Sequence, residues 1–223
     1  NLPLGIALVH EIQERPIGCV AHHHDFAWER DRFLINCVDD VIHFAFPPAL
    51  QQIQHVVINS LAGEEFSRRT GLSCRIVPNV MDFANPPCEP DDYARSFRNE
   101  IGMRDDELLI LQPTRVVPRK GIEHSISLIM HLRNPKCKLV VSHESGDEGQ
   151  EYHHALIDLA EESGVDLRFV HTDMSTTAPP PTANGASVAS LAEVYAQADL
   201  ITYPSLYEGF GNALLEAFYY RKP

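Results

Sequence analysis

Two glutamates near the end of the sequence, Glu208 and Glu216, have a spacing that could serve one ligand. They lie in the string Tyr-Pro-Ser-Leu-Tyr-Glu-Gly-Phe-Gly-Asn-Ala-Leu-Leu-Glu, residues 203–216. A strand of apolar residues is predicted just before Glu208, and a helix is predicted over 211–220. Eight residues make about two helical turns, so both carboxylates can flank one ligand. Glycines let the backbone approach a ligand, and the free amides at a helix start favour an anion. For either glutamate alone, a helix cap is the alternative interpretation.

A basic turn forms the second group of candidate residues. Arg115, Arg119 and Lys120 lie in the string Gln-Pro-Thr-Arg-Val-Val-Pro-Arg-Lys-Gly, residues 112–121. A predicted strand precedes this turn and a predicted helix follows it. Two cations at a strand end, beside a helix N-terminus, are suited to hold a diphosphate. The alternative is a solvated basic turn with no ligand.

Three consecutive histidines form the third group. His22, His23 and His24 precede Asp25 and follow a short apolar segment at 17–21 that is predicted to be a strand. Zinc sites usually take their ligands from spaced positions, and adjacent side chains on a loop rarely converge on one ion. The pattern therefore indicates a ligand-contacting loop at a strand end, and we predict no metal site.

The composition excludes several classes of protein. The chain has 223 residues and a net charge of −13, and no cluster of lysines and arginines is large enough to bind nucleic acid through its phosphates. No apolar run approaches the roughly 18 residues of a membrane span. The five cysteines are odd in number and include no Cys-x-x-Cys pair, which favours reduced thiols and a cytoplasmic protein.

The elements that must position these residues alternate along the chain. Short apolar segments predict strands at 17–21, 55–59, 75–77, 107–113, 137–142, 166–170 and 199–203. Between them, helical patterns cover 3–14, 61–70, 121–132, 150–163, 187–197 and 211–220. This alternation predicts an α/β fold of doubly wound parallel sheets. The proline-rich segment 83–92 favours a boundary, which divides the chain into domains 1–85 and 86–223.

Taken together, the three motifs resemble those of family 4 of the retaining glycosyltransferases, which carry Glu-x7-Glu and Arg-x4-Lys-Gly. The resemblance implies the GT-B fold, in which two Rossmann-like domains face a cleft. Residues 1–85 would be the second half of the N-terminal, acceptor-side domain. Residues 86–223 would be the first part of the C-terminal domain, which binds the nucleotide sugar. On this resemblance both domains are incomplete, as in a fragment or a partly described chain.

The resemblance also implies a role for each motif. Glu208 and His23 would contact the transferred sugar, Arg115 and Lys120 the diphosphate, and Glu216 the ribose. The register of the histidine is open, so His22 and His24 remain alternatives. Further donor contacts would come from Asp25 of the histidine loop, from Gly146 of the loop that follows the strand at 137–142, and from the segment between the glutamates: Gly209, Phe210, Gly211 and Asn212.

The implied reaction transfers a hexose from a nucleotide-diphosphate sugar, with UDP or GDP as the expected nucleotide, to a hydroxyl of a small-molecule or glycan acceptor. No cofactor and no metal are expected, because the sequence has no Asp-x-Asp at a strand end and its cations would take the place of a metal at the diphosphate. Two alternatives stay open: a catalytically silent module that binds sugar nucleotides, and an epimerase or phosphorylase of the same architecture.

Overall fold

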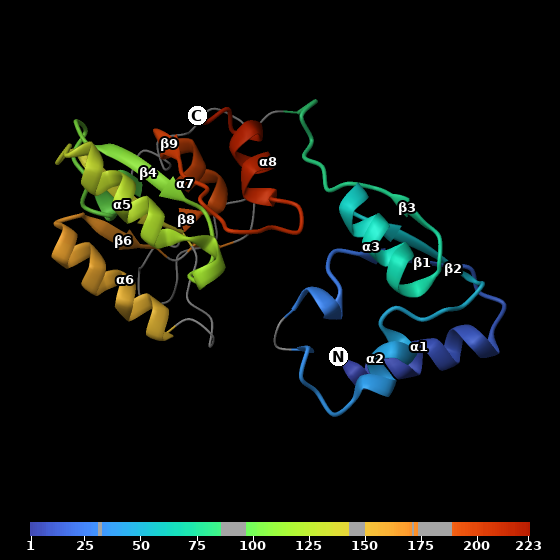
Figure 1. Ribbon diagram of the computed structural model, residues 1–223. Helices are drawn as coiled ribbons and strands as arrows, with labels where there is room; N and C mark the ends of the chain where they lie inside the picture. Colours follow the sequence, from blue (N-terminus) through green and yellow to red (C-terminus); the bar gives the residue numbers. More distant parts are fainter. Residues whose placement is uncertain (31–32, 86–96, 143–149, 171, 174–188) are drawn as a thin grey trace, which may run out of the picture. The chain divides into compact units, whose positions relative to one another are not determined.

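The computed structural model describes residues 1–30, 33–85, 97–142, 150–170, 172–173 and 189–223 (Figure 1). The chain divides into two compact units, Asn1–Val80 and Met81–Pro223. The sequence-based boundary after residue 85 lies five residues further along the chain.

The first unit is built on a three-stranded parallel sheet of order β1-β2-β3. Its strands are β1 (Cys19–His23), β2 (Ile53–Val57) and β3 (Cys74–Ile76). Its helices are α1 (Leu2–Glu14), the one-turn η1 (Ala27–Glu29), α2 (Asp39–Ala45) and α3 (Ser60–Thr70).

Local sequence explains the bounds of α3. The side chain of Asn59 accepts a hydrogen bond from the Ala62 amide at 2.8 Å and so caps the helix. Gly71, with φ of 70°, ends it in the left-handed conformation that glycine adopts readily. Phe66 on α3 is fully buried with Val57 of β2, so this helix covers one face of the small sheet beside the carboxyl end of β1.

The second unit contains a four-stranded parallel sheet of order β6-β5-β4-β9 and a two-stranded parallel sheet of β7 and β8. The strands are β4 (Leu108–Gln112), β5 (Cys137–Val141), β6 (Leu167–Phe169), β7 (Thr172–Asp173), β8 (Ala189–Ser190) and β9 (Leu200–Ile201). The helical elements are η3 (Pro118–Lys120), α5 (Ile122–Leu132), α6 (Gln150–Ser163), α7 (Leu191–Gln197) and α8 (Asn212–Tyr219).

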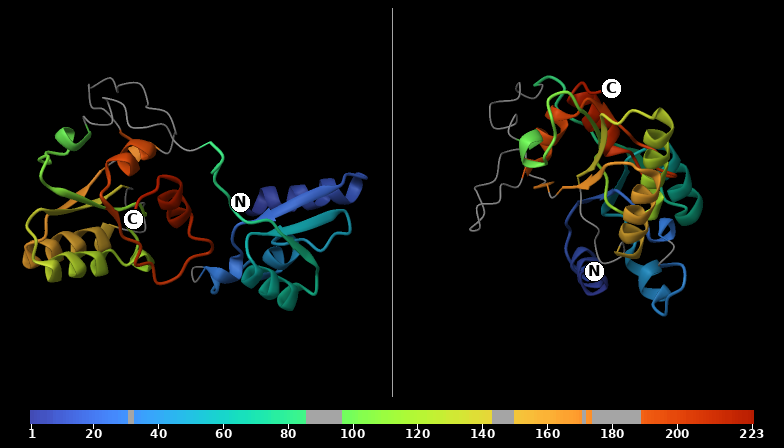
Figure 2. Two further views of the ribbon diagram at one scale, coloured as in Figure 1. Left: turned by 90° about the horizontal axis from the view of Figure 1, so that it is seen from above. Right: turned by 90° about the vertical axis from the view of Figure 1, so that its left-hand side faces the viewer.

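The larger sheet is covered on both faces, as its uninterrupted apolar strands predict. Leu109 and Leu111 of β4 pack with residues of α7 and α8. Ile110, between them, points to the opposite face and packs with residues of α5 and α6. Figure 2 shows α5 and α6 side by side against this sheet. The predicted α/β class with doubly wound parallel sheets is therefore confirmed.

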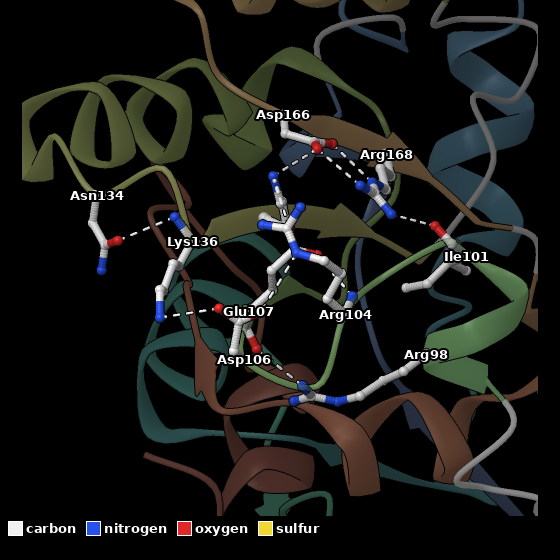
Figure 3. Close-up of polar contacts among 10 residues, drawn as sticks. Arg98, Ile101, Arg104, Asp106, Glu107, Asn134, Lys136, Asp166 and Arg168 are labelled. Carbon is white, nitrogen blue, oxygen red and sulfur yellow. Dashed lines mark hydrogen bonds and ion pairs between the residues drawn. The ribbon is translucent and has the colours of Figure 1, made fainter.

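Charged side chains join the strands at the amino ends of this sheet (Figure 3). Lys138 of β5 lies 3.0 Å from Asp166 and 3.4 Å from Glu107. Arg168 of β6 donates to both oxygens of Asp166 at 2.7 and 2.8 Å. These hydrogen bonds from Arg168, aided by Lys138, lower the pKa of Asp166 to about 2. The network lies at the edge opposite the strand ends that carry the predicted ligand-binding loops.

The sequence-based element bounds differ from the observed ones mainly in the first unit. The predicted strands at 17–21 and 55–59 are found at Cys19–His23 and Ile53–Val57, each displaced by two residues. The helix α2 was not predicted, because it is only seven residues long and its N-cap side chain, Val38, makes no capping hydrogen bond. Among the helices that the structure describes, none combines the length and apolarity that crossing a bilayer requires.

Candidate functional site

The basic turn and the glutamate-bearing loop follow two strands that are neighbours in the sheet. Strands β4 and β9 run parallel, with Leu111 opposite Ile201. The Thr202 amide continues the ladder by donating to the Leu111 carbonyl at 2.8 Å. Because both strands end at the same edge, the segments that follow them begin side by side, at the edge where open α/β sheets bind ligands.

Two backbone features join these segments. The Leu206 amide donates to the Arg119 carbonyl at 2.9 Å. Gly121, which ends η3 and precedes α5, has φ of 62°, and a Cβ added to it would lie 2.5 Å from the Pro204 carbonyl oxygen. A side chain at this position would therefore force the two segments apart.

This close approach brings Lys120 onto Glu208. The ammonium nitrogen of Lys120 donates to Oε1 of Glu208 in a short contact, and Lys120 is only 8% exposed. Arg119 Nη1 lies 3.4 Å from the other oxygen, Oε2. The Tyr203 ring centroid is 5.9 Å from the Lys120 nitrogen, and Arg119 lies over the Tyr207 ring at 5.7 Å. Two predicted ligand contacts are thus each other's partners in the structure.

Burial and hydrogen bonding act against each other on this pair. Burial lowers the pKa of Lys120, and the Glu208 carboxylate offsets part of that effect. Burial also raises the pKa of Glu208, but the nearby hydroxyl and ammonium donors, Lys120 foremost, outweigh it and hold that pKa below its usual range. Because several donors converge on the Glu208 carboxylate, its ionised form is favoured in the pair with Lys120.

Three cations and one carboxylate gather in the described segments that follow β4 and β9. Arg115 is exposed, and its charge, like that of Arg119, lowers the pKa of Lys120, so the three cations lie near one another. Glu208 neutralises only part of their charge. The buried hydroxyl of Ser205 is near enough to Glu208 to lower its pKa, yet in the described part of the chain it has no partner at hydrogen-bond geometry. This arrangement favours an anionic ligand that also carries hydroxyl groups.

A buried glutamine fixes the shape of the basic turn. Gln112, at the end of β4, donates to the Lys120 carbonyl at 2.9 Å and to Thr114 Oγ1 at 3.3 Å. Its own carbonyl oxygen accepts a hydrogen bond from Ser125 of α5 at 2.7 Å. Gln112 is fully buried, so its amide joins both ends of the turn to the first part of α5.

The second glutamate is held by a different partner. Glu216, half-buried on α8, accepts a hydrogen bond from the Tyr195 hydroxyl at 2.8 Å. The segment between the two glutamates enters α8 at Gly211, whose φ is 92° and where an added Cβ would lie 3.2 Å from the Tyr203 hydroxyl. Gly209, Phe210 and Asn212 lie in the same turn.

In the first unit, His23 packs inward. Its Nε2 lies 3.0 Å from Nδ1 of His55, and its ring contacts Phe26 and Phe66 at centroid distances of 4.9 and 5.7 Å. Burial, and then the proximity of His55 and His22, lowers the pKa of His23 to about 4. The ring is therefore neutral near pH 7.

The neighbouring histidines are placed differently. His22 and His24 are exposed, with ring centroids 4.6 Å apart, as expected for positions that alternate with His23 along the strand direction. Asp25 forms a short ion pair with Arg30. Within the described residues, no group of three or more histidine, cysteine or acidic side chains is arranged to hold a metal ion.

One predicted donor contact, Gly146, lies outside the residues that the structure describes. Sequence reasoning did not single out Gln112, Tyr195 or Tyr203, and it ranked Arg119 below Arg115, although Arg119 is the arginine that contacts Glu208. A polar residue that ends an apolar strand, such as Gln112, was the available signal.

The chain has two α/β units, and loops that carry candidate ligand contacts follow the carboxyl ends of their parallel strands. This fold is that of the GT-B glycosyltransferases. The Anabaena protein HepE, solved in complex with UDP and glucose, matches with a TM-score of 0.71 at 17% identity, over 100% of this chain and 56% of that one. WaaG, a glycosyltransferase involved in lipopolysaccharide biosynthesis, matches with a TM-score of 0.67 at 16% identity, over 97% of this chain and 61% of that one.

Among curated proteins, the chain is similar to two mannosylglucosylglycerate synthases. The Petrotoga mobilis protein is 32% identical over 244 aligned residues, which cover 100% of this chain and 55% of that protein. The Thermotoga maritima protein is 32% identical over 221 aligned residues, which cover 92% of this chain and 49% of that protein. The chain thus spans about half the length of these relatives. No protein-family model matches it.

Proposed function

We propose that the protein is a retaining, metal-independent glycosyltransferase of the family 4 type that takes a hexose from a nucleotide-diphosphate sugar, with UDP or GDP as the nucleotide. The observation that carries this proposal is the cluster at the ends of β4 and β9, where Lys120 and Arg119 contact Glu208 and Arg115 lies near Lys120. A diphosphate matches the excess of cations, and sugar hydroxyls match the carboxylate.

In the proposed reaction, the bond between the anomeric carbon of the donor sugar and the diphosphate oxygen breaks. Its electron pair remains on the diphosphate. An acceptor hydroxyl oxygen bonds to the anomeric carbon, and its proton passes to the departing diphosphate oxygen. Lys120 and Arg115 stabilise the negative charge that develops on the diphosphate, and Lys120 does so from a buried position, where a fixed charge acts most effectively. Glu208, released from Lys120, accepts hydrogen bonds from the sugar.

Metal independence and retention rest on different support. The lysine and arginines already supply the positive charge that a metal would bring to a diphosphate. Retention rests on the resemblance of Glu208 and Glu216 to the Glu-x7-Glu motif. It is tested by comparing the anomeric configuration of the product with that of the donor by NMR.

The acceptor class comes from the relatives. The two synthases are named for mannosylglucosylglycerate, so we propose that this protein also forms a glycerate glycoside that contains mannose and glucose. The contact between the sugar and a histidine belongs to the first unit and stays a prediction. The exposed His22 and His24 are more available for it than the inward-packed His23.

The donor site is tested by measuring the melting temperature of the full-length protein with UDP, GDP and ADP sugars in the presence of EDTA. We expect one nucleotide to stabilise the protein. Lys120→Ala removes a charge-assisted contact and should weaken that binding roughly 10- to 100-fold. Lys136→Ala is the matched control, because Lys136 pairs with Asp106 at the opposite edge of the sheet, at 3.1 Å.

Three outcomes would overturn parts of the proposal. Undiminished donor binding by Lys120→Ala contradicts the diphosphate assignment. Binding without transfer or hydrolysis indicates a silent module. A requirement for inorganic phosphate, without release of free nucleotide diphosphate, indicates a phosphorylase.

A further inference from the structure

We propose that Tyr195 is a positioning residue for the nucleotide ribose, which acts by holding one oxygen of Glu216 so that the carboxylate faces the ribose hydroxyls. This inference rests on the proposed function, because it takes Glu216 as the ribose contact.

The Tyr195 hydroxyl has one hydrogen and two acceptors within reach. Oε2 of Glu216 lies at 2.8 Å and the Ala213 carbonyl at 3.2 Å. Hydrogen bonds to charged acceptors are shorter and stronger than those to neutral acceptors, so the hydroxyl hydrogen points to Glu216 and not to the Ala213 carbonyl. Burial, and then the charge of Glu216, raises the pKa of Tyr195, which keeps the hydroxyl a donor across the physiological range.

The position of this hydroxyl is fixed by the core. The Tyr195 ring is 0% exposed and packs with Leu109, Leu111 and Ala217. The Tyr220 ring stacks on it at 4.9 Å and 11°. The helix that carries Tyr195, α7, begins with a capping box in which the Ser190 amide donates to Glu193 at 2.6 Å and the Glu193 amide to Ser190 at 3.3 Å.

Packing alone does not require the oxygen, because phenylalanine would fill the same space in this apolar cluster. The Tyr195 hydroxyl does fix the carboxylate of Glu216, a half-buried side chain on another helix, α8. Within the described part of the chain, Oε1 of Glu216 makes no hydrogen bond, and each carboxylate oxygen can accept more than one. Held in this way, Glu216 can accept hydrogen bonds from both hydroxyls of a ribose.

The experiment compares ribose recognition in the wild-type protein and in Tyr195→Phe, both at full length. Dissociation constants are measured for UDP and GDP and for their 2′-deoxy and 3′-deoxy analogues. For the nucleotide that binds, we expect the wild type to favour the ribose form by roughly tenfold. In Tyr195→Phe that preference should fall to about two- or threefold, while the ring stays packed and the melting temperature shows a folded protein.

A double-mutant cycle separates positioning from stability. In a Glu216→Ala background, Tyr195→Phe should have no further effect on the ribose preference. Tyr152→Phe is the matched control: it removes another, partly buried tyrosine hydroxyl that donates to a carboxylate, that of Glu123, and should leave the preference unchanged.

Each result has one meaning. A lower melting temperature with an unchanged ribose preference in Tyr195→Phe overturns the inference and leaves the proposed function intact. Failure of every nucleotide to bind the folded wild-type protein overturns the proposed function itself. A wild type that binds nucleotides without ribose preference overturns the role of Glu216, and with it that of Tyr195.

Discussion

Burial lowers the pKa of two histidines in the first unit. His23 and His55 share a 3.0 Å contact within an aromatic cluster, and burial lowers the pKa of both. A depressed pKa in the folded state means that the unfolded chain binds protons at a higher pH. For His23 the interval runs from its ordinary value of 6.5 down to about 4. Its contribution to stability is present above pH 6.5 and is lost as the pH falls toward 4.

This interval gives a testable pH dependence. Acidification from pH 7 to pH 4.5 should cost the first unit about 1–2 kcal/mol through His23, a value reduced for the partial exposure of the ring. Urea unfolding across this range measures the cost. His23→Phe should flatten the dependence, whereas His43→Gln, which changes an exposed histidine of the same unit, should keep it. An equally steep dependence in His23→Phe would show that other groups are responsible.

The sequence indicated candidate side chains but not their partners. Glu208 and Lys120 were both predicted as donor contacts, and the structure pairs them across 88 residues of sequence. That pairing depends on the order of strands β4 and β9 in the sheet, which residue spacing does not encode. The contact between Arg119 and Glu208 depends on the same strand order. Gln112 was missed because its partners, the Lys120 carbonyl and the Thr114 and Ser125 hydroxyls, come together only when the turn folds back onto α5.

At the scale of elements, the larger sheet was predicted well because its strands are continuous apolar segments between helices. Each of its four strands was expected at nearly the right residues. The strands of the first unit were harder to place, because β1 and β2 mix apolar residues with histidines and glutamine, so the apolar pattern marks their ends poorly. At the junction of η3 and α5, the close approach of Gly121 to Pro204 leaves no room for a side chain. The sequence does not predict this constraint, because glycine occurs in many kinds of turn.

Gly121→Ala tests this junction. Its positive φ and the 2.5 Å approach to the Pro204 carbonyl should together cost about 2–4 kcal/mol of stability. The same change should weaken donor binding, because Lys120 and Glu208 are carried by the two segments that must separate.

Gly164→Ala is the matched control for strain. Gly164 has φ of 66° with no atom within 4 Å of an added Cβ, so this variant should lose only about 1 kcal/mol and keep its donor affinity. Chemical denaturation and nucleotide titration of both variants measure the two effects. Equal losses of stability would show that the close approach to Pro204 is relieved at no cost.

At the scale of the whole molecule, the chain forms two units with separate cores. Ligand and pH should therefore act on different units. In calorimetry, a nucleotide at a hundredfold excess over its dissociation constant should stabilise the second unit by about 2.7 kcal/mol and raise its transition by about 5–10 °C. Acidification to pH 5 should lower the transition of the first unit. A single transition that responds to both would show that the units unfold together.

Under the proposed function, the ion pair between Lys120 and Glu208 also bears on turnover. An intact donor would compensate both partners at once, because its phosphate oxygens would replace Glu208 at the lysine while its sugar hydroxyls would replace Lys120 at the carboxylate. A spent nucleotide diphosphate has no sugar to offer, so Glu208 would compete with it for the lysine. We therefore expect the pair to favour fresh donor over spent product and to limit product inhibition. Inorganic phosphate would meet the same competition.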